Sequence, residues 1–147
     1  ADPKRVCIMG WSYGGYAALQ APLKSPGTYK CSIAGAAVSN MHHFLLNAKK
    51  YHGYSRYKKY IKDDSVSLDE ISPFSHMDKL KLPILMLHGN EDRSVPYEQS
   101  EEFNEQYKGK NKNFKFIKLE NEDHYLSNQK NKVIFLTEVE QFLKKNL

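Results

Sequence analysis

Three short stretches of this sequence are apolar or small at almost every position, and they restrict the folds open to the chain. They span residues 6–9, 32–39 and 83–87, and a fourth, more polar stretch spans residues 114–119. Uninterrupted apolar runs are typical of strands covered by helices on both faces, as in a parallel sheet. The polar residues of the fourth run suit an edge strand. The sequence therefore predicts an α/β fold with a mostly parallel sheet flanked by helices.

Helical patterns lie between and after these strands. Residues 13–21 are rich in Ala, Leu and Gln, and Pro22 predicts that this helix ends there. A second helix is predicted over residues 97–107, whereas residues 40–80 show little periodicity. The last helix is predicted to bury one apolar stripe, formed by Val133, Leu136, Val139 and Leu143.

Composition narrows the class of protein. With 147 residues, 40% of them apolar and 27% charged, the chain is long enough for one domain and is not disordered. The net charge of +5 comes mainly from lysines, which indicate a solvated surface. The basic, tyrosine-rich stretch 49–60 precedes Asp63 and Asp64, so we interpret it as a solvated helix with its tyrosines turned inward and expect no nucleic-acid partner. No apolar run reaches the roughly 18 residues of a membrane span, so we expect no membrane partner.

The cysteines and histidines give no sign of a cofactor site. Cys7 and Cys31 form no C-x-x-C pair, so we expect free thiols, a reducing compartment and a cytoplasmic protein. His42 and His43 have no third ligand at suitable spacing, so we expect no metal and no other cofactor. The chain begins without Met or an apolar leader and enters a strand within five residues, as expected of a piece of a longer protein.

The sharpest motif is the segment Gly-Trp-Ser-Tyr-Gly-Gly at residues 10–15, directly after the first predicted strand. It contains G-x-S-x-G between a strand and a helix, the setting in which this motif exposes a nucleophilic serine. We expect Gly10 and Gly14 to avoid clashes across the tight turn, and Ser12 to be the nucleophile. The backbone N–H of Tyr13, at the start of the helix, is the candidate oxyanion donor.

Two further candidate catalytic residues follow later strands. Asp92 lies just after the third strand, and its neighbour Glu91 is the rival acid. His124 follows the fourth strand, which favours it over the other five histidines as the base. The chain order Ser12, Asp92, His124 is the nucleophile–acid–base order of α/β-hydrolases. We interpret His88 and the remaining histidines as structural or surface residues.

With these motifs, the chain resembles the prolyl oligopeptidase family of serine peptidases. The similarity lies in residues 10–16, in His-Gly-x-x-Asp-x-x-Val-Pro at residues 88–96, and in Asp-His-Tyr at residues 123–125. It implies that residues 1–147 are the C-terminal portion of the family's α/β-hydrolase catalytic domain, with upstream strands missing.

The resemblance also implies roles for individual residues. Ser12 is implied as the nucleophile, Asp92 as the orienting acid and His124 as the general base. A hydrophobic pocket for the residue before the scissile bond is implied at Tyr13, Val38, Met41, Phe44 and Val95. Met41 stands where some family members carry an aromatic residue, which argues against a strict preference for proline.

Our leading hypothesis is a serine-type peptidase that acts on peptides or oligopeptides without a metal or cofactor. One alternative is an esterase of the same fold, and another is a catalytically incompetent fragment that acts only by association. Because no strand precedes residues 6–9 in the chain, we also expect this strand to have an open edge and to form a homo-oligomer.

Overall fold

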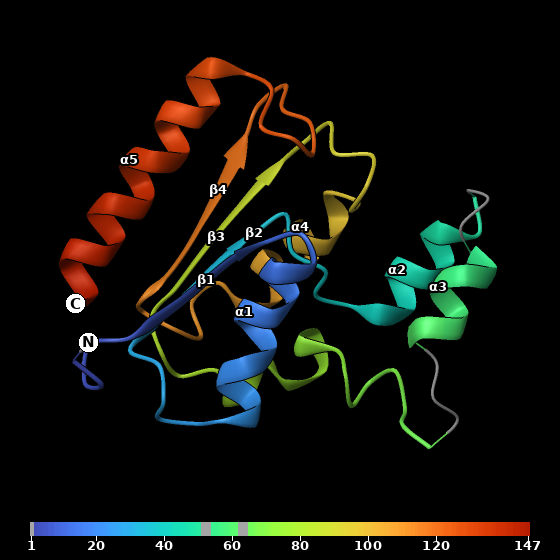
Figure 1. The fold of residues 1–147 in the computed structure, drawn as a ribbon, viewed down its shortest axis with the longest axis horizontal. Coiled ribbons are helices and arrows are strands. Elements are labelled where there is room, and N and C mark those ends of the chain that lie inside the picture. Colours follow the sequence, from blue (N-terminus) through green and yellow to red (C-terminus); the bar gives the residue numbers. More distant parts are fainter. Residues whose placement is uncertain (1, 51–53, 62–64) are drawn as a thin grey trace.

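Four parallel strands form the centre of the protein (Figure 1). The computed structural model describes residues 2–50, 54–61 and 65–147. The strands are β1 (Cys7–Trp11), β2 (Cys31–Gly35), β3 (Ile84–Gly89) and β4 (Phe114–Leu119). They lie in one sheet in the order β1-β2-β3-β4, and every neighbouring pair is parallel. The predicted parallel α/β fold is confirmed, and β4 lies at an edge of the sheet as expected.

Helices cover both faces of this sheet. They are α1 (Tyr13–Lys24), α2 (Met41–Ala48), α3 (Tyr54–Ile61), the 3₁₀ helix η1 (Pro73–Lys79), α4 (Glu98–Tyr107) and α5 (Gln129–Asn146). Figure 1 shows α5 on one side of the sheet and α1 and α4 on the other, with α2 and α3 standing away from the strands. Helices α2 and α3, from the part of the sequence without clear periodicity, therefore lie at one end of the layered core, whereas η1 packs against α1.

The apolar runs are explained by two separate cores. On one face, Ala34 of β2 and Met86 of β3 pack with Phe103 of α4, and all three are fully buried. On the other face, Ile33 and Leu85, the neighbours of these residues along the strands, pack against α5. Successive side chains of a strand point to opposite faces, so a strand covered twice needs apolar residues at every position.

The boundary predicted for the first helix is wrong. Helix α1 continues through Pro22 and ends at Lys24. Proline removes one backbone hydrogen bond from a helix. Here it lies in the last turns, where Pro22 is itself buried and the preceding Ala18 and Leu19 are fully buried in the core. Burial of this helix face outweighs the loss of one bond.

The stripe predicted for the last helix is also wrong in part. Val133 and Leu136 are exposed by 59% and 64%, whereas Val139 and Phe142 are buried and Asn131 is buried with them. Residues three apart are separated by about 300° around a helix, so a stripe with steps of three winds off the buried face. The side chain of Asn131 donates a hydrogen bond to the carbonyl oxygen of Glu120, which a purely apolar pattern does not reveal.

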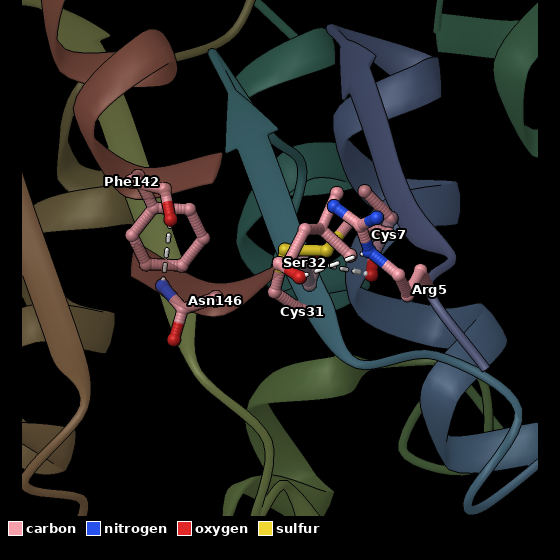
Figure 2. Close-up of a disulfide and its surroundings, with 8 residues drawn as sticks. Arg5, Cys7, Cys31, Ser32, Phe142 and Asn146 are labelled. Carbon is pink, nitrogen blue, oxygen red and sulfur yellow. Dashed lines mark hydrogen bonds between the residues drawn. A yellow bond between two sulfur atoms is a disulfide. The ribbon is translucent and has the colours of Figure 1, made fainter. Parts of the chain in front are cut away.

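Cys7 and Cys31 form a disulfide, so the expectation of free thiols is wrong. They occupy directly paired positions of β1 and β2, with their Cα atoms 4.6 Å apart (Figure 2). The connection through α1 brings residues 24 positions apart in sequence into register, which no cysteine motif indicates. The expectation of a cytoplasmic protein rested on free thiols, and the disulfide removes that support. In the part of the chain that the structure describes, no helix is long and apolar enough to cross a membrane.

Candidate active site

The three predicted catalytic side chains meet at the carboxyl end of the sheet. Ser12 follows β1, Asp92 lies in the loop after β3, and His124 lies in the loop after β4. The His124 Nε2 atom is 3.0 Å from Ser12 Oγ, and His124 Nδ1 is 2.6 Å from Asp92 Oδ2. The rival acid, Glu91, is exposed to solvent. The structure therefore brings together the serine, imidazole and carboxylate chosen from the sequence.

Ser12 adopts a backbone conformation that side chains rarely take, with φ 60° and ψ −119°. Its N–H donates a hydrogen bond to the Gly35 carbonyl oxygen over 2.8 Å, which holds the turn against β2. A Cβ at Gly10 would overlap the Gly14 carbonyl, as the sequence predicted. The expectation for Gly14 is wrong, because a Cβ there meets nothing within 4 Å. The second required glycine is Gly15, where a Cβ would overlap the Gly35 carbonyl.

Tyr13 is the first residue of α1. The N–H groups of the first helical turn have no carbonyl partners within the helix, and the helix dipole makes them favourable to negative charge. The backbone of Tyr13 is therefore placed where a negatively charged oxygen beside Ser12 would be stabilised. Its side chain is 76% exposed and lies at the same site.

Asp92 is buried, and hydrogen bonds surround its carboxylate. Oδ1 accepts the backbone N–H groups of Ser94 and Val95 at 2.8 and 2.9 Å. Burial alone would raise the pKa of Asp92, but hydrogen bonds from His88, His124 and the Val95 N–H outweigh it, and the pKa is lowered. The carboxylate is thus held ionised and oriented toward His124.

The loop that carries His124 is fixed by its neighbours. The indole Nε1–H of Trp11 donates to the His124 carbonyl oxygen over 2.8 Å, so the residue before Ser12 positions His124. The Asp123 carboxylate accepts hydrogen bonds from the Ser127 hydroxyl at 2.7 Å and from the Tyr125 N–H at 2.8 Å. These bonds lower the pKa of Asp123. Sequence reasoning missed the role of Trp11, although it lies next to Ser12 in the motif.

A cavity of about 710 Å³ opens beside Ser12 and His124. The five residues predicted for the substrate pocket all line it: Tyr13, Val38, Met41, Phe44 and Val95. The sequence did not indicate the remaining lining residues, which are Tyr16, Tyr57, Ile61, Ser94 and Tyr125. Among the described residues that line the cavity, none is Asp, Glu, Lys or Arg. The site is therefore an apolar, largely aromatic pocket next to a serine–histidine pair.

Tyr57 belongs to the stretch 49–60, which was interpreted as a solvated helix with inward tyrosines and not as part of the pocket, and Ile61 follows that stretch directly. Residues 54–61 do form a helix, α3, but its Tyr57 ring packs against Phe44 of α2 with centroids 5.4 Å apart. Residues 51–53 of that stretch lie outside the described residues.

The other histidines occupy different environments. His42 and His43 are half-exposed and lie near carboxylates of Asp69 and Glu102, at 3.5 and 2.8 Å. Within residues 2–50, 54–61 and 65–147, no group of three side chains is arranged to hold a metal ion. His52 lies outside the described residues. His88, in contrast, is fully buried and touches Asp92.

Comparison with known proteins places this geometry in a family. The sequence profile of the prolyl oligopeptidase family matches residues 1–147, the whole chain. The chain belongs to the prolyl oligopeptidase family. It is 28% identical over 145 residues to dipeptidyl peptidase 4 of Bos taurus, a match that covers 97% of this chain and 18% of that protein. The chain thus spans about a fifth of the length of this relative.

Solved structures agree with that membership. A puromycin-hydrolyzing peptidase of Mycobacterium tuberculosis superimposes with a TM-score of 0.85 and 26% identity, over 100% of this chain and 22% of that one. An esterase of Pyrococcus furiosus shares the fold with a TM-score of 0.70 and 20% identity, over 97% of this chain and 54% of that one. The resemblance to the prolyl oligopeptidase family is confirmed, together with the α/β-hydrolase fold.

Proposed function

We propose that Ser12, His124 and Asp92 are the catalytic triad of a serine peptidase that cleaves peptides. The observation that carries this proposal is the continuous chain of hydrogen-bond distances from Ser12 Oγ through His124 to Asp92, 3.0 and 2.6 Å. It ends at a carboxylate that is held ionised. A serine with a strained backbone at a strand–helix turn, an imidazole and a buried acid form the arrangement that activates a hydroxyl.

In the proposed reaction, Ser12 Oγ attacks the carbonyl carbon of the substrate while His124 Nε2 takes the hydroxyl proton. The tetrahedral intermediate places its oxygen near the Tyr13 N–H. His124 then returns the proton to the leaving amine as the carbon–nitrogen bond breaks. A water molecule repeats the sequence on the acyl-enzyme and frees Ser12. Asp92 stays ionised throughout and holds the imidazole in the required tautomer.

The cavity supports a substrate with an apolar residue before the scissile bond. Its aromatic and aliphatic lining favours burial of a hydrophobic side chain, and its volume of about 710 Å³ is ample for one. Met41, a flexible side chain, adapts to different shapes. We therefore propose acceptance of several bulky apolar residues rather than proline alone.

Labelling with a fluorophosphonate tests the nucleophile. The reagent forms a bond between its phosphorus and an activated serine Oγ and releases fluoride. We expect labelling at Ser12, loss of labelling in Ser12→Ala, and unchanged labelling in Ser94→Ala, a matched control that removes another serine lining the same cavity. A folded wild-type chain that takes up no label would contradict the proposal and favour a fragment that acts only by association.

The same triad also serves esterases, so a second comparison addresses the reaction. The wild-type protein, once shown to react with the fluorophosphonate, is incubated with an anilide and an ester that carry the same apolar acyl group. Peptidase function predicts Ser12-dependent release from the anilide as well as from the ester. Release from the ester alone would favour the esterase alternative.

We further propose that the chain associates through β1. Within the described residues β1 pairs with β2 only, and Met9 on this strand is 52% exposed. Strand edges with unpaired N–H and C=O groups add strands from other chains. Light scattering at micromolar concentration is expected to give at least a dimer, with Met9→Lys weakening it. A monomeric mass for the wild type would overturn this proposal.

The compartment is also part of the proposal. Structural disulfides persist where the surroundings are oxidising and are rare in a reducing cytosol. The Cys7–Cys31 bond therefore favours an oxidising compartment over the cytoplasm. Alkylation of the protein immediately on lysis of its source cells distinguishes the two, because only reduced cysteines take up the reagent.

A further inference from the structure

The carboxylate of Asp92 is contacted by a second histidine besides His124. His88 lies near the end of β3 and is fully buried. Its Nε2 atom is 3.3 Å from Asp92 Oδ2, the same oxygen that His124 Nδ1 approaches at 2.6 Å. The sequence interpretation of His88 as a structural or surface residue overlooked this contact. His88 and Asp92 lie four residues apart across the turn after β3, and this spacing does not show whether their side chains meet.

Hydrogen bonding determines which form of His88 fits this site. Its Nε2 atom is also 3.1 Å from the Val95 carbonyl oxygen, which only accepts hydrogen bonds, so Nε2 carries the hydrogen. Its Nδ1 atom is 2.7 Å from Ser100 Oγ, whose hydroxyl donates to it. A neutral imidazole is thereby satisfied on both nitrogens. Its hydrogen on Nε2 is shared between the Val95 carbonyl and Asp92.

We propose that His88 is a positioning residue, which holds the Asp92 carboxylate in the orientation that serves His124. This inference rests on the triad proposed above and extends it by one residue. With His88 and His124 on Oδ2 and the N–H groups of Ser94 and Val95 on Oδ1, the carboxylate has four donors around it. A carboxylate surrounded in this way cannot rotate without breaking several bonds at once.

The groups around the pair come from three directions. The loop after β4 contributes His124, and Asp123 beside it interacts electrostatically with Asp92. Helix α4 contributes the Ser100 hydroxyl. The Tyr97 ring, just before α4, lies edge-on to the His88 ring with centroids 5.8 Å apart. Tyr97 and Ser100 thus fix the imidazole, and the imidazole in turn fixes the acid.

Two substitutions separate positioning from packing. His88→Leu fills the space without a donor, whereas the side-chain amide of His88→Gln places an N–H near the position of Nε2. We expect fluorophosphonate labelling of Ser12 to slow roughly ten- to hundredfold in the leucine variant, since a hydrogen bond to a charged group is lost. The glutamine variant is expected to recover most of that rate. His43→Leu, an exposed histidine outside the site, is the matched control.

The pH dependence supplies a readout that a merely structural role would not move. His88 stabilises the ionised form of Asp92, so its loss raises the pKa of Asp92 toward or above its usual value. The titration of Asp92 then shifts to higher pH in His88→Leu and returns in His88→Gln. Titration of the Asp92 carboxyl carbon by NMR measures the same shift without any turnover.

The outcomes distinguish this inference from the proposed function. If the wild type takes up no label but the Asp92 titration moves in His88→Leu and returns in His88→Gln, the positioning role stands and the catalytic proposal falls. If the wild type is labelled and neither the rate nor the titration changes in folded His88→Leu, the positioning role is overturned. Should that variant not fold, Ser100→Ala replaces it, because removing the donor to Nδ1 is expected to shift the Asp92 titration in the same direction. An unchanged Asp92 titration in folded Ser100→Ala would then overturn it.

Discussion

The cavity beside Ser12 has two walls of different construction. The inner wall comes from the ends of strands, where Ser12, Val95 and His124 are held by hydrogen bonds to the backbone or to buried side chains. The outer wall comes from α2 and α3, where Phe44 and Ile61 pack in a small apolar cluster apart from the main core. In the proposed reaction, the chemistry is placed at the ends of the strands, and substrate fit is left to a small apolar cluster that Val95 joins to the inner wall.

One buried side chain connects the two walls. Gln99 of α4 accepts hydrogen bonds from the N–H groups of Ser39 and Asn40, at 2.9 and 2.8 Å, and donates to the Asn40 carbonyl oxygen at 3.0 Å. Asn40 in turn caps α2 by accepting from the N–H groups of its first turn. Gln99 thus helps to set the direction in which α2 leaves the sheet. The Met41 N–H, which donates to Ser72 Oγ over 2.9 Å, holds the start of the helix from another side.

Removal of the disulfide tests how much the inner wall depends on this covalent bond and how much on the hydrogen-bonded sheet. We expect it to have the largest effect on stability of the changes considered. We expect replacement of Cys7 and Cys31 together by alanine to lower the free energy of unfolding by about 3 kcal/mol, because the open chain gains entropy when a loop of this size is no longer closed. That loop contains α1 and Ser12. Urea denaturation of the oxidised wild type and of the double variant measures the difference.

The control is the wild type treated with a reductant, which should lose the same stability as the double variant. The double variant itself should not respond to the reductant. Equal unfolding midpoints in all three samples would show that the inner wall is held by the hydrogen-bonded sheet alone. The labelling rate of Ser12 per folded molecule is expected to stay the same, since the bond lies among residues that do not line the cavity.

The inner wall is also the part that sequence reasoning found. Strand ends are marked by apolar runs, and Ser12, Asp92 and His124 follow three of those runs. Parallel strands bring their carboxyl ends to one edge, so placement after a strand was sufficient to predict that the three residues meet. Contacts made through the fold were not predictable in this way. The contacts of His88 with Asp92 and of Trp11 with His124 depend on side-chain directions that spacing does not encode.

The outer wall and the disulfide were missed for other physical reasons. Tyr57 and Ile61 face the cavity from a helix that also carries one arginine and two lysines, so its pattern resembled a solvated surface. The pairing of Cys7 with Cys31 requires the register of β1 against β2, which the spacing of the two cysteines in the sequence does not show. Likewise, Val133 and Leu136 are apolar but exposed, because three-residue steps leave the buried face of α5. Periodicity predicts an element more readily than it predicts its partner.

A substitution in the outer wall sharpens the comparison and has the smallest effect expected. In Phe44→Ala the cavity loses one aromatic contact and α2 loses the ring that packs on Tyr57. For a peptidyl phosphonate with a bulky apolar residue next to phosphorus, we expect the inhibition constant to rise about tenfold, since part of one apolar side chain is no longer buried. The limiting rate of Ser12 modification should stay nearly constant, because the inner wall is untouched.

Leu46→Ala is the matched control for this prediction. Leu46 lies on the same helix, is 55% exposed and does not line the cavity, so its loss should leave both constants unchanged. Labelling kinetics over a range of phosphonate concentrations separate the inhibition constant from the limiting rate. A fall in the limiting rate at an unchanged inhibition constant would mean that α2 positions the triad as well as the substrate. The two walls would then act as one unit, and the division between a rigid catalytic edge and an adaptable pocket would have to be abandoned.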